Sequence, residues 1–171
     1  MNLSIRPATV QDATLIADLS RQTFYDTFAA QNTAANMKKF LNEQFTRGRL
    51  MIEVGRQGNT FLLAYYASQV AGYIKLRETQ TPPALIGKAN LEIARLYACK
   101  EYIGKGVGHH LMQASLDLGR EKGKELAWLC VWEKNQRAID FYTRWGFEKF
   151  GDIDFLLGDD LQNDWMMKRV I

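Results

Sequence analysis

The sequence predicts an α/β fold, in which helices cover one mixed sheet within a single domain spanning residues 1–171. Segments with the twofold alternation of strands and the 3.6-residue period of helices follow one another in the order β-α-α-β-β-β-α-β-α-β-β. A chain of 171 residues can form one hydrophobic core and is too short for two ordinary domains. It contains no internal repeat, low-complexity tract or linker that would divide it.

The first half of the chain carries a strand, two helices and a strand hairpin. Thr9 and Asp12 form a capping-box pattern before the first helix, with Asp in the usual position of Glu. Met37, Phe40, Leu41 and Phe45 are expected on one side of the second predicted helix. The predicted elements are a strand starting at Leu3–Arg6, a helix after Asp12, a helix over about Thr33–Thr46, and the paired strands Phe61–Tyr66 and Val70–Leu76.

In the second half, strands and helices alternate after a turn-rich loop over Thr79–Asn90. A near-continuous apolar run predicts one buried strand. Asn135 is a good N-cap, and Gly146 a good left-handed C-cap, for the helix between them. The predicted elements are the strand Leu91–Ala98, a helix from Val107 to near Gly123, the strand Leu126–Val131, the helix Asn135–Trp145, and strands near Glu148–Ile153 and Trp165–Ile171.

Composition argues against several classes of protein. The net charge is +3 and the pI is about 8.8, below the value of about 9 that nucleic-acid-binding domains usually exceed. No apolar run is long enough for a membrane span, and Arg6 and Pro7 stand where a signal peptide needs its apolar segment. Cys99 and Cys130 are too few for a disulfide framework, and no spacing fits a metal site. We therefore expect a cytoplasmic protein that binds no nucleic acid, membrane or metal.

Charge is unevenly distributed along the chain. Basic residues and the two histidines gather between Lys100 and Lys124, whereas residues 150–167 contain no Lys or Arg. A basic zone for an anionic cofactor and an acidic zone for a cationic substrate would have this pattern, and so would ordinary solvated faces. The acidic segment contains Asp152, Asp154, Asp159, Asp160 and Asp164.

The most informative segment is the glycine-rich turn Tyr102–His109, which lies between a predicted strand and a predicted helix. Gly104, Gly106 and Gly108 let the backbone turn tightly and bring its N–H groups close to a ligand. The first N–H groups of a helix lack internal partners and lie at the positive end of the helix dipole. Together with Lys105, they predict a pyrophosphate site. A glycine-rich turn that binds nothing is the alternative.

Two other phosphate-binding motifs do not fit this turn. A dinucleotide-binding fingerprint needs a third glycine at the position of His109, and a Walker loop needs Ser or Thr directly after Gly-Lys. Both classes are therefore excluded on spacing.

Three sequence blocks, in order and separation, resemble the GNAT superfamily of acetyl-CoA-dependent N-acetyltransferases. They are Glu92–Ala98, Gly104–Gly108, and the pattern Asn135-x-x-Ala138-Ile139-x-Phe141-Tyr142-x-x-x-Gly146-Phe147. Within the superfamily, three segments resemble bacterial spermidine/spermine N-acetyltransferases. They are Phe24–Phe28, Trp132–Asn135 and the closing stretch Phe155–Met167. The likeness covers nearly the whole chain. One departure is Ile103, which stands where the family usually has Arg or Gln.

The resemblance implies a GNAT-like fold, with a mixed, mostly antiparallel sheet flanked by helices and strands that splay apart at the acetyl-CoA site. A main-chain N–H at the end of one strand would polarise the thioester carbonyl. Backbone amides would bind the pyrophosphate, so binding is expected to tolerate Ile103. The residues implied in cofactor binding are Leu96, Tyr97, Ala98, Ile103, Gly104, Lys105, Gly106, Val107, Gly108, His109, Asn135 and Tyr142.

Acetyl transfer to an amine needs a base and an acid. An alkylamine with a pKa of about 10.4 arrives protonated and must lose a proton before it attacks. Glu92 resembles the glutamate on a strand that serves as the general base in some family members. Alternatively, Glu92 is a strand residue that only forms an ion pair with Lys or Arg. Tyr142 matches the family's tyrosine acid for the leaving thiolate, with core packing as the alternative. We expect direct attack in a ternary complex, because a Cys99–His109 nucleophile would lack a third member.

The resemblance implies that the acceptor is a primary amine, with a polyamine such as spermidine or spermine as the first choice. Acetylation of a peptide or protein amine, in a groove shaped by residues 79–90, is a second possible function. An acetyl-CoA-binding sensor without turnover is a third. The oligomeric state stays open, with a homodimer among the alternatives. The expected substrate-binding residues, several of which could equally pack in the core, are Phe24, Tyr25, Asp26, Phe28 and Glu92.

Overall fold

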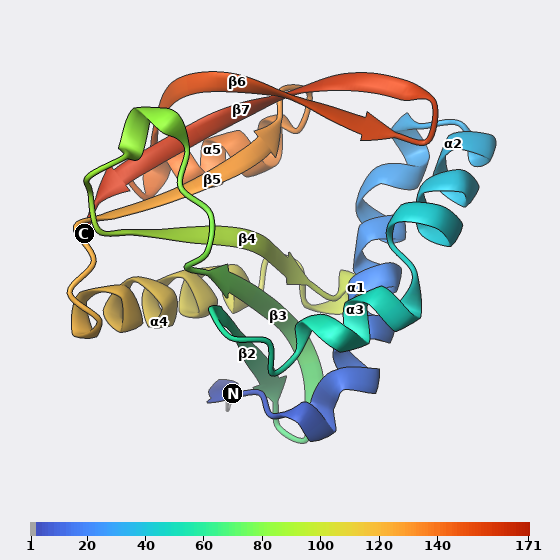
Figure 1. Cartoon of the computed structure of the whole chain (residues 1–171). Coiled ribbons are helices and arrows are strands. Elements are labelled where there is room, and N and C mark those ends of the chain that lie inside the picture. The colour runs from blue at the N-terminus through green and yellow to red at the C-terminus, as the bar shows by residue number, and fades with distance from the viewer. Residues whose placement is uncertain (1–2) are drawn as a thin grey trace.

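The computed structural model describes residues 3–171. A seven-stranded sheet in the order β1-β2-β3-β4-β5-β7-β6 runs through the molecule, with helices on both faces (Figure 1). β4 and β5 are parallel, and the other neighbouring pairs in the described chain are antiparallel. The predicted α/β class and mixed, mostly antiparallel sheet are confirmed. The strands are β1 (Leu3–Pro7), β2 (Asn59–Tyr66), β3 (Gln69–Arg77), β4 (Asn90–Ala98), β5 (Leu126–Trp132), β6 (Glu148–Leu157) and β7 (Asp160–Val170).

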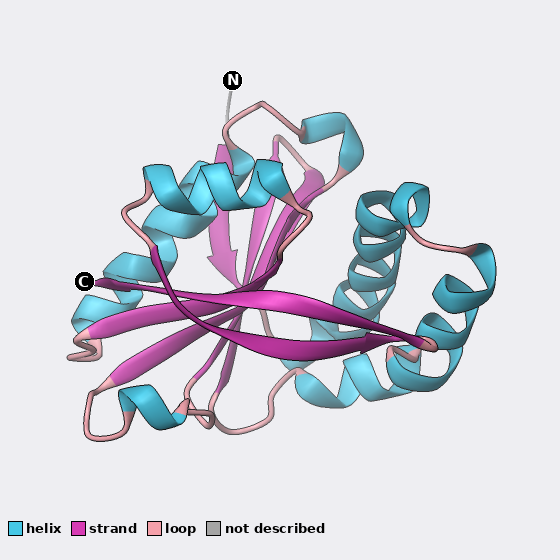
Figure 2. Cartoon of the chain, turned by 90° about the horizontal axis from the view of Figure 1, so that it is seen from above, coloured by secondary structure: helices cyan, strands magenta, loops and turns pink. Residues whose placement is uncertain are grey.

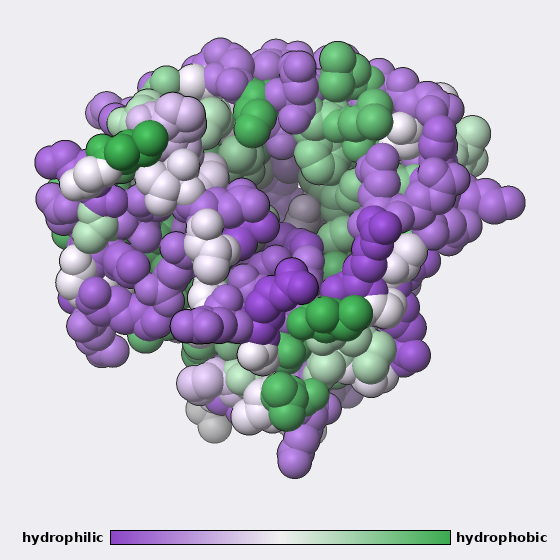
Figure 3. Space-filling model, in the orientation of Figure 1, coloured by the Kyte–Doolittle hydropathy of each residue, from purple (hydrophilic) through white to green (hydrophobic). Residues whose placement is uncertain are grey.

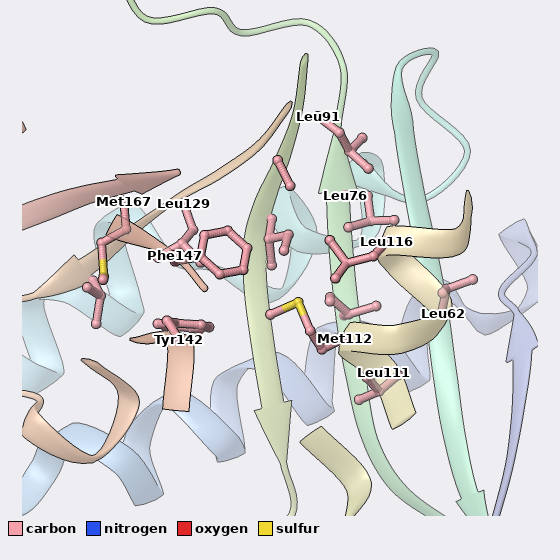
Figure 4. Packing of buried hydrophobic residues seen from close by; sticks show 14 of the residues in the cluster. Leu62, Leu76, Leu91, Leu111, Met112, Leu116, Leu129, Tyr142, Phe147 and Met167 are labelled. Carbon is pink, nitrogen blue, oxygen red and sulfur yellow. The ribbon is translucent and has the colours of Figure 1, made fainter. Parts of the chain in front are cut away.

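One face of the sheet packs against α4 (Val107–Glu121) and α5 (Gln136–Arg144). Alternate residues of the central strands are apolar and point to this face, where they meet the apolar side of α4. Asn135 caps α5 as predicted, since its Oδ1 accepts the N–H of Ala138 at 3.2 Å. Figure 4 shows this core, in which the labelled residues are Leu62, Leu76, Leu91, Leu111, Met112, Leu116, Leu129, Tyr142, Phe147 and Met167.

The opposite face of β2 and β3 is covered by α1 (Ala13–Phe28) and α3 (Arg47–Glu53). Beyond them, aromatic side chains of α1 and the following helical segments form a second cluster, in which Phe24 stacks on Phe40 at 4.5 Å. Figure 2 shows the strands fanning out, so that these helices stand to one side of the β6–β7 half of the sheet. This arrangement leaves a hollow on this face, visible at the centre of Figure 3.

The helix predicted over about Thr33–Thr46 is present over residues 34–44, but the expectation of one regular helix with Phe45 on the same side as Phe40 was wrong. The α-helix α2 (Ala34–Lys39) is followed by a π-helical turn, Phe40–Gln44. The wider turn lets Phe40 and Phe45 stack at 5.4 Å in one cluster, which a continuous α-helix would not place on one side. Thr46 then caps α3, a helix that the sequence did not predict, by accepting the N–H of Arg49.

The last two strands are longer than predicted and form a hairpin that reaches α2 (Figure 1). The N–H of Asp159 donates to Oδ1 of Asn36 at 2.9 Å, and the Asp159 carboxylate pairs with Lys39. Gly158 has φ +63°, and a Cβ there would lie 2.7 Å from Cα of Asn36. The hairpin therefore docks closely on α2 through its turn, and this contact bounds the hollow on the side of β6 and β7.

Candidate active site

The parallel strands β4 and β5 pair over three residues and then diverge. Their ladder joins residues 90–92 to residues 126–128, whereas β4 continues to Ala98 and β5 to Trp132. In the ladder with β3, Lys75 opposes Arg95 and Leu76 opposes Ile93, so Ala94 is the extra residue of a bulge that changes the course of β4. The splay that the family resemblance implied is confirmed.

The main chain of β4 turns unpaired groups toward this opening. The N–H of Cys99 donates to the carbonyl of Ala71 in β3 at 2.8 Å. Successive N–H groups of an antiparallel strand point to opposite sides, so those of Leu96 and Ala98 point away from β3. They face the opening that β5 has left, and they are placed to donate to a carbonyl oxygen held between the strands.

The glycine-rich turn at the start of α4 presents a set of N–H donors. Gly104 and Gly106 have φ of +80° and +84°, a backbone region that other residues rarely adopt. Within the turn, the N–H of Lys105 donates to the carbonyl of Tyr102 at 3.1 Å. The N–H groups that have no acceptor among the described residues are those of Gly104, Gly106, Val107, Gly108 and His109. Such a cradle of amides at a helix N-terminus fits a pyrophosphate.

Side chains hold this cradle in place. Tyr102 stacks on Tyr66 at 5.4 Å, and Nζ of Lys105 lies 5.3 Å from the centre of the Tyr102 ring. The ring of His109 packs 4.8 Å from that of Trp145 and so joins α4 to the end of α5. Ile103, which replaces the usual Arg or Gln, is 41% exposed at the edge of the turn.

Tyr142 lies in the core between the sheet and α5. Its ring is 9% exposed and makes edge contacts with Phe141 and Phe147 at 5.5 and 5.9 Å. Figure 4 shows it beside β4 and below Phe147. Burial raises the pKa of the Tyr142 phenol above its ordinary value, so the hydroxyl keeps its proton at neutral pH. Its role as an acid stays a prediction.

Glu92 lies on the face of β4 that turns toward the hollow, because its neighbours Leu91 and Ile93 point into the α4 core. Arg77 holds both of its carboxylate oxygens, with Nε at 2.6 Å and Nη2 at 2.9 Å. The structure thus shows the paired arrangement that the sequence allowed. Whether Glu92 also serves as a base stays a prediction.

The residues expected to bind substrate are dispersed. Phe24 is 6% exposed in the aromatic cluster, and Phe28 packs against Trp132 of β5 at 6.0 Å. Tyr25 is half exposed and lines a separate pocket beside α1. Asp26 accepts a hydrogen bond from Gln22 on the same helix. Of these helix residues, the structure brings Phe28 to β5, next to the opening between the strands.

A pocket that the sequence did not predict lies where β5 ends. β5 stops opposite Asp164, and the edge of β7 from residue 160 to 163 is left without a β5 neighbour. This step encloses a pocket of about 220 Å³ in which three carboxylates meet an indole ring. Its lining residues are Trp132, Glu133, Lys134, Asp154, Asp160, Leu161, Gln162 and Asn163.

A buried ion network, also unpredicted, supports the floor of the hollow. Glu53 of α3 pairs with Arg95 at 2.6 Å and with Lys75 at 3.1 Å. Lys75 is 3% exposed, and burial, reinforced by the nearby Arg95 charge, lowers the pKa of its ammonium to about 8. The network ties α3 to β3 and β4. No local sequence pattern indicates this network, because its members are separated by up to 42 residues.

Other expected features can be placed in the same way. The thiol of Cys99 lies 3.6 Å from the carbonyl of Val70, and burial raises its pKa, while His109 packs on Trp145 instead. Among residues 3–171, no group of three or more His, Cys, Asp or Glu side chains is arranged to hold a metal ion. No helix in that part of the chain is long and apolar enough to cross a bilayer.

Residues 19–147 match the Acetyltransferase (GNAT) family. An uncharacterized N-acetyltransferase of Lactobacillus delbrueckii subsp. lactis is 35% identical over 90% of this chain and 88% of its own length. The spermidine N(1)-acetyltransferase of Thermoplasma acidophilum is 26% identical over 86% of this chain and 89% of its own. The crystal structure of the PaiA N-acetyltransferase from Thermoplasma acidophilum in complex with coenzyme A superposes with a TM-score of 0.80 over 100% of both chains, at 23% identity.

The splayed strands, the amide cradle and these likenesses define an acetyl-CoA-dependent N-acetyltransferase. The chain belongs to the GNAT acetyltransferase family. The expected enzyme class and acetyl-CoA as cosubstrate are confirmed.

Proposed function

We propose that the acceptor is a polyamine such as spermidine or spermine, and that the acetyl group goes to one of its primary amines. The observation that carries this proposal is the acidic pocket at the end of β5. Glu133, Asp154 and Asp160 converge there beside Trp132, with Lys134 as the one cation in the lining. The pocket lies next to the opening between β4 and β5, where the acetyl group would be presented.

A polyamine matches this pocket because it carries several ammonium groups separated by methylene segments. Converging carboxylates attract such a cation more strongly than dispersed ones do, and an indole ring can contact the methylenes or an ammonium group. A lysine side chain or a peptide N-terminus offers a single cation to the same surface. The similarity to a spermidine N(1)-acetyltransferase of Thermoplasma acidophilum supports the same acceptor class.

The residues of this chain divide the work as follows in the proposed reaction. The amides of residue 104 and residues 106–109 bind the pyrophosphate, and the N–H groups of Leu96 and Ala98 orient and polarise the thioester carbonyl. Asn135 caps α5 and, in the proposal, also contacts the pantetheine arm. Acetyl-CoA supplies the acetyl group, and Tyr142 protonates the coenzyme A thiolate that leaves. The amine attacks directly in a ternary complex.

Steady-state kinetics with two acceptors tests the polyamine proposal. In the double variant Glu133→Gln/Asp160→Asn, we expect KM for spermidine to rise about 2- to 30-fold, since exposed carboxylates contribute about 0.2–1 kcal/mol each. KM for butylamine, which has a single cation, should stay within twofold. The control Glu148→Gln removes a charge from the same hairpin outside the pocket and should leave both values unchanged.

Three results would contradict the proposal. An equal rise in KM for spermidine and for butylamine in the double variant would show that the pocket does not bind a second cation of the acceptor. More efficient acetylation of peptide amines than of spermidine would identify a peptide acceptor. Tight acetyl-CoA binding without turnover of any amine would indicate a sensor.

A further inference from the structure

We propose that Asp164 of β7 is the catalytic carboxylate that receives the acceptor ammonium and removes its proton. The inference rests on the proposed transfer to an alkylamine and adds the group that prepares the amine for attack. Asp164 is paired in the sheet with Trp132 of β5 and with Ile153 of β6. In the sequence it is one of five aspartates between residues 150 and 167, and no local pattern distinguishes it from the others.

The direction of the Asp164 side chain follows from the register. Directly opposed residues of an antiparallel pair point to the same face of the sheet, and Trp132 points toward Phe28 of α1. Asp164 therefore points to the face of the hollow, next to the place where β5 ends. On the same face, Cys130 occupies the preceding inward position of β5 and Glu92 lies on β4.

Asp164, placed by the register at the end of β5, also interacts electrostatically with groups on both splayed strands. Its charge contributes to raising the pKa of Tyr97 on β4 and that of Cys130 on β5, although burial is the main cause for both groups. Tyr97 lies beyond the last paired residue of β4 and β5, on the part of β4 that borders the opening. The main-chain N–H groups of Leu96 and Ala98, on either side of Tyr97, face the same opening.

Asp164 differs from Asp152 and Glu92 in its hydrogen bonds. Its Oδ1 is buried and has no hydrogen-bond partner among residues 3–171. Asp152, in contrast, accepts from Asn163 and pairs with Lys149, and both oxygens of Glu92 are held by Arg77. A buried carboxylate oxygen without a donor is costly, and a bound ammonium group would supply that donor.

The surroundings of Asp164 also suit proton removal. Burial, and secondarily the charge of Glu133, raises the pKa of Asp164 to about 6. Relative to a carboxyl at its ordinary pKa, this makes proton transfer from an ammonium group about 100-fold less unfavourable. The titratable groups that interact with it are Glu133 at the end of β5, Cys130 within β5 and Tyr97 on β4. The paired residue on β6, Ile153, carries no charge.

The proton and electron balance of the step is complete. One N–H bond of the ammonium group breaks, the proton goes to Asp164, and the lone pair left on nitrogen forms the amide bond. As the carbon–sulfur bond breaks, sulfur receives the proton of Tyr142, which is restored by the second proton that nitrogen loses. Asp164 then ionises again, so one proton is released to water for each acetyl group transferred.

The test is the pH dependence of kcat/KM for spermidine between pH 6 and 10 at saturating acetyl-CoA. For wild type, kcat/KM should be constant between about pH 7 and 9, where the carboxylate is ionised and the amine is protonated. Asp164→Asn should be about 100-fold slower at pH 7, and its rate should rise about tenfold per pH unit toward wild type, because only neutral amine can react. Asp140→Asn, on the exposed side of α5, should keep the wild-type profile.

Glu92→Gln in the same series separates the two candidate bases. A wild-type profile in Asp164→Asn, with a changed KM alone, would overturn the inference, and so would a sloping profile in Glu92→Gln instead. Acetyl-CoA affinity and thermal unfolding of Asp164→Asn should match wild type, which shows that the variant is folded. If wild type acetylates no amine, the proposed function fails together with the inference; if it does so with an unchanged Asp164→Asn profile, the inference alone fails.

Discussion

Removal of the Tyr142 hydroxyl separates the chemistry from the packing at this site. The ring is 9% exposed and packs edge-on against Phe141 and Phe147, contacts that Tyr142→Phe retains. We therefore expect the free energy of unfolding to change by less than about 1 kcal/mol. Loss of a general acid should lower kcat about 10²- to 10⁴-fold, equivalent to about 3–5 kcal/mol in the activation barrier.

The assay is spermidine-dependent release of free CoA thiol at pH 7.5, with acetyl-CoA affinity measured by calorimetry. Affinity should stay within about twofold of wild type, because the amide cradle on α4 is untouched. Tyr73→Phe is the matched control, because this hydroxyl is also buried and lies on the other side of the sheet. A Tyr142→Phe kcat within threefold of wild type, or an equal loss in Tyr73→Phe, would refute the acid role.

Three further predictions follow from the backbone and the buried charges. In Gly158→Ala, a residue at φ +63° would also contact the Asn36 backbone, so the free energy of unfolding should fall by about 2–4 kcal/mol. The control Gly123→Ala, at φ +70° in open space, should lower it by only about 1 kcal/mol. Both values are measured by denaturant titration. Gly106→Ala should weaken acetyl-CoA binding about 5- to 30-fold in calorimetry, whereas Gly87→Ala, with a similar φ of +86°, should not. The pKa of Lys75 is about 8 in the folded chain and about 10.4 unfolded. The unfolded state therefore binds more protons between these values, and stability relative to Lys75→Met should rise by about 1–3 kcal/mol from pH 8 to 10.

The parts of this fold that local chemistry determines could be predicted from the sequence. The caps at Thr9–Asp12 and Asn135, and the positive φ of Gly104 and Gly106, depend on residues a few positions apart. The amphipathic period of α4 and the apolar run of β5 are equally local. These features determine where the amide cradle forms, and so its place at the start of α4 could be predicted, whereas the individual residues that bind the cofactor stay predictions.

Features that depend on distant contacts were missed. The π-helical turn after α2 exists because Phe40 and Phe45 enter one cluster with residues of α1 and β6. The hairpin extends through Asp154 and Asp160, which have low strand propensity, because its turn docks on Asn36. Tertiary packing outweighs local preference in both places.

The acceptor side of the site shows the same division. Five aspartates in one segment gave no means of separating the exposed ones from Asp164, whose burial depends on where β5 ends. The partner of Glu92, Arg77, is 15 residues away on a neighbouring strand. Glu92 and Tyr142 could be predicted as candidates from the family resemblance. The position of Asp164 at the opening, in contrast, follows only from the register of β5, β6 and β7.

The most direct test of the account is the ratio of kcat/KM for spermidine to that for a lysine-containing peptide, from CoA thiol release at pH 7.5. We predict efficient turnover of spermidine and a ratio well above tenfold, because the acidic pocket binds the further cations that the peptide amine lacks. A ratio below one would contradict the polyamine assignment and favour a peptide acceptor. No turnover of either amine, with acetyl-CoA bound, would contradict the assignment as an amine-acetylating enzyme.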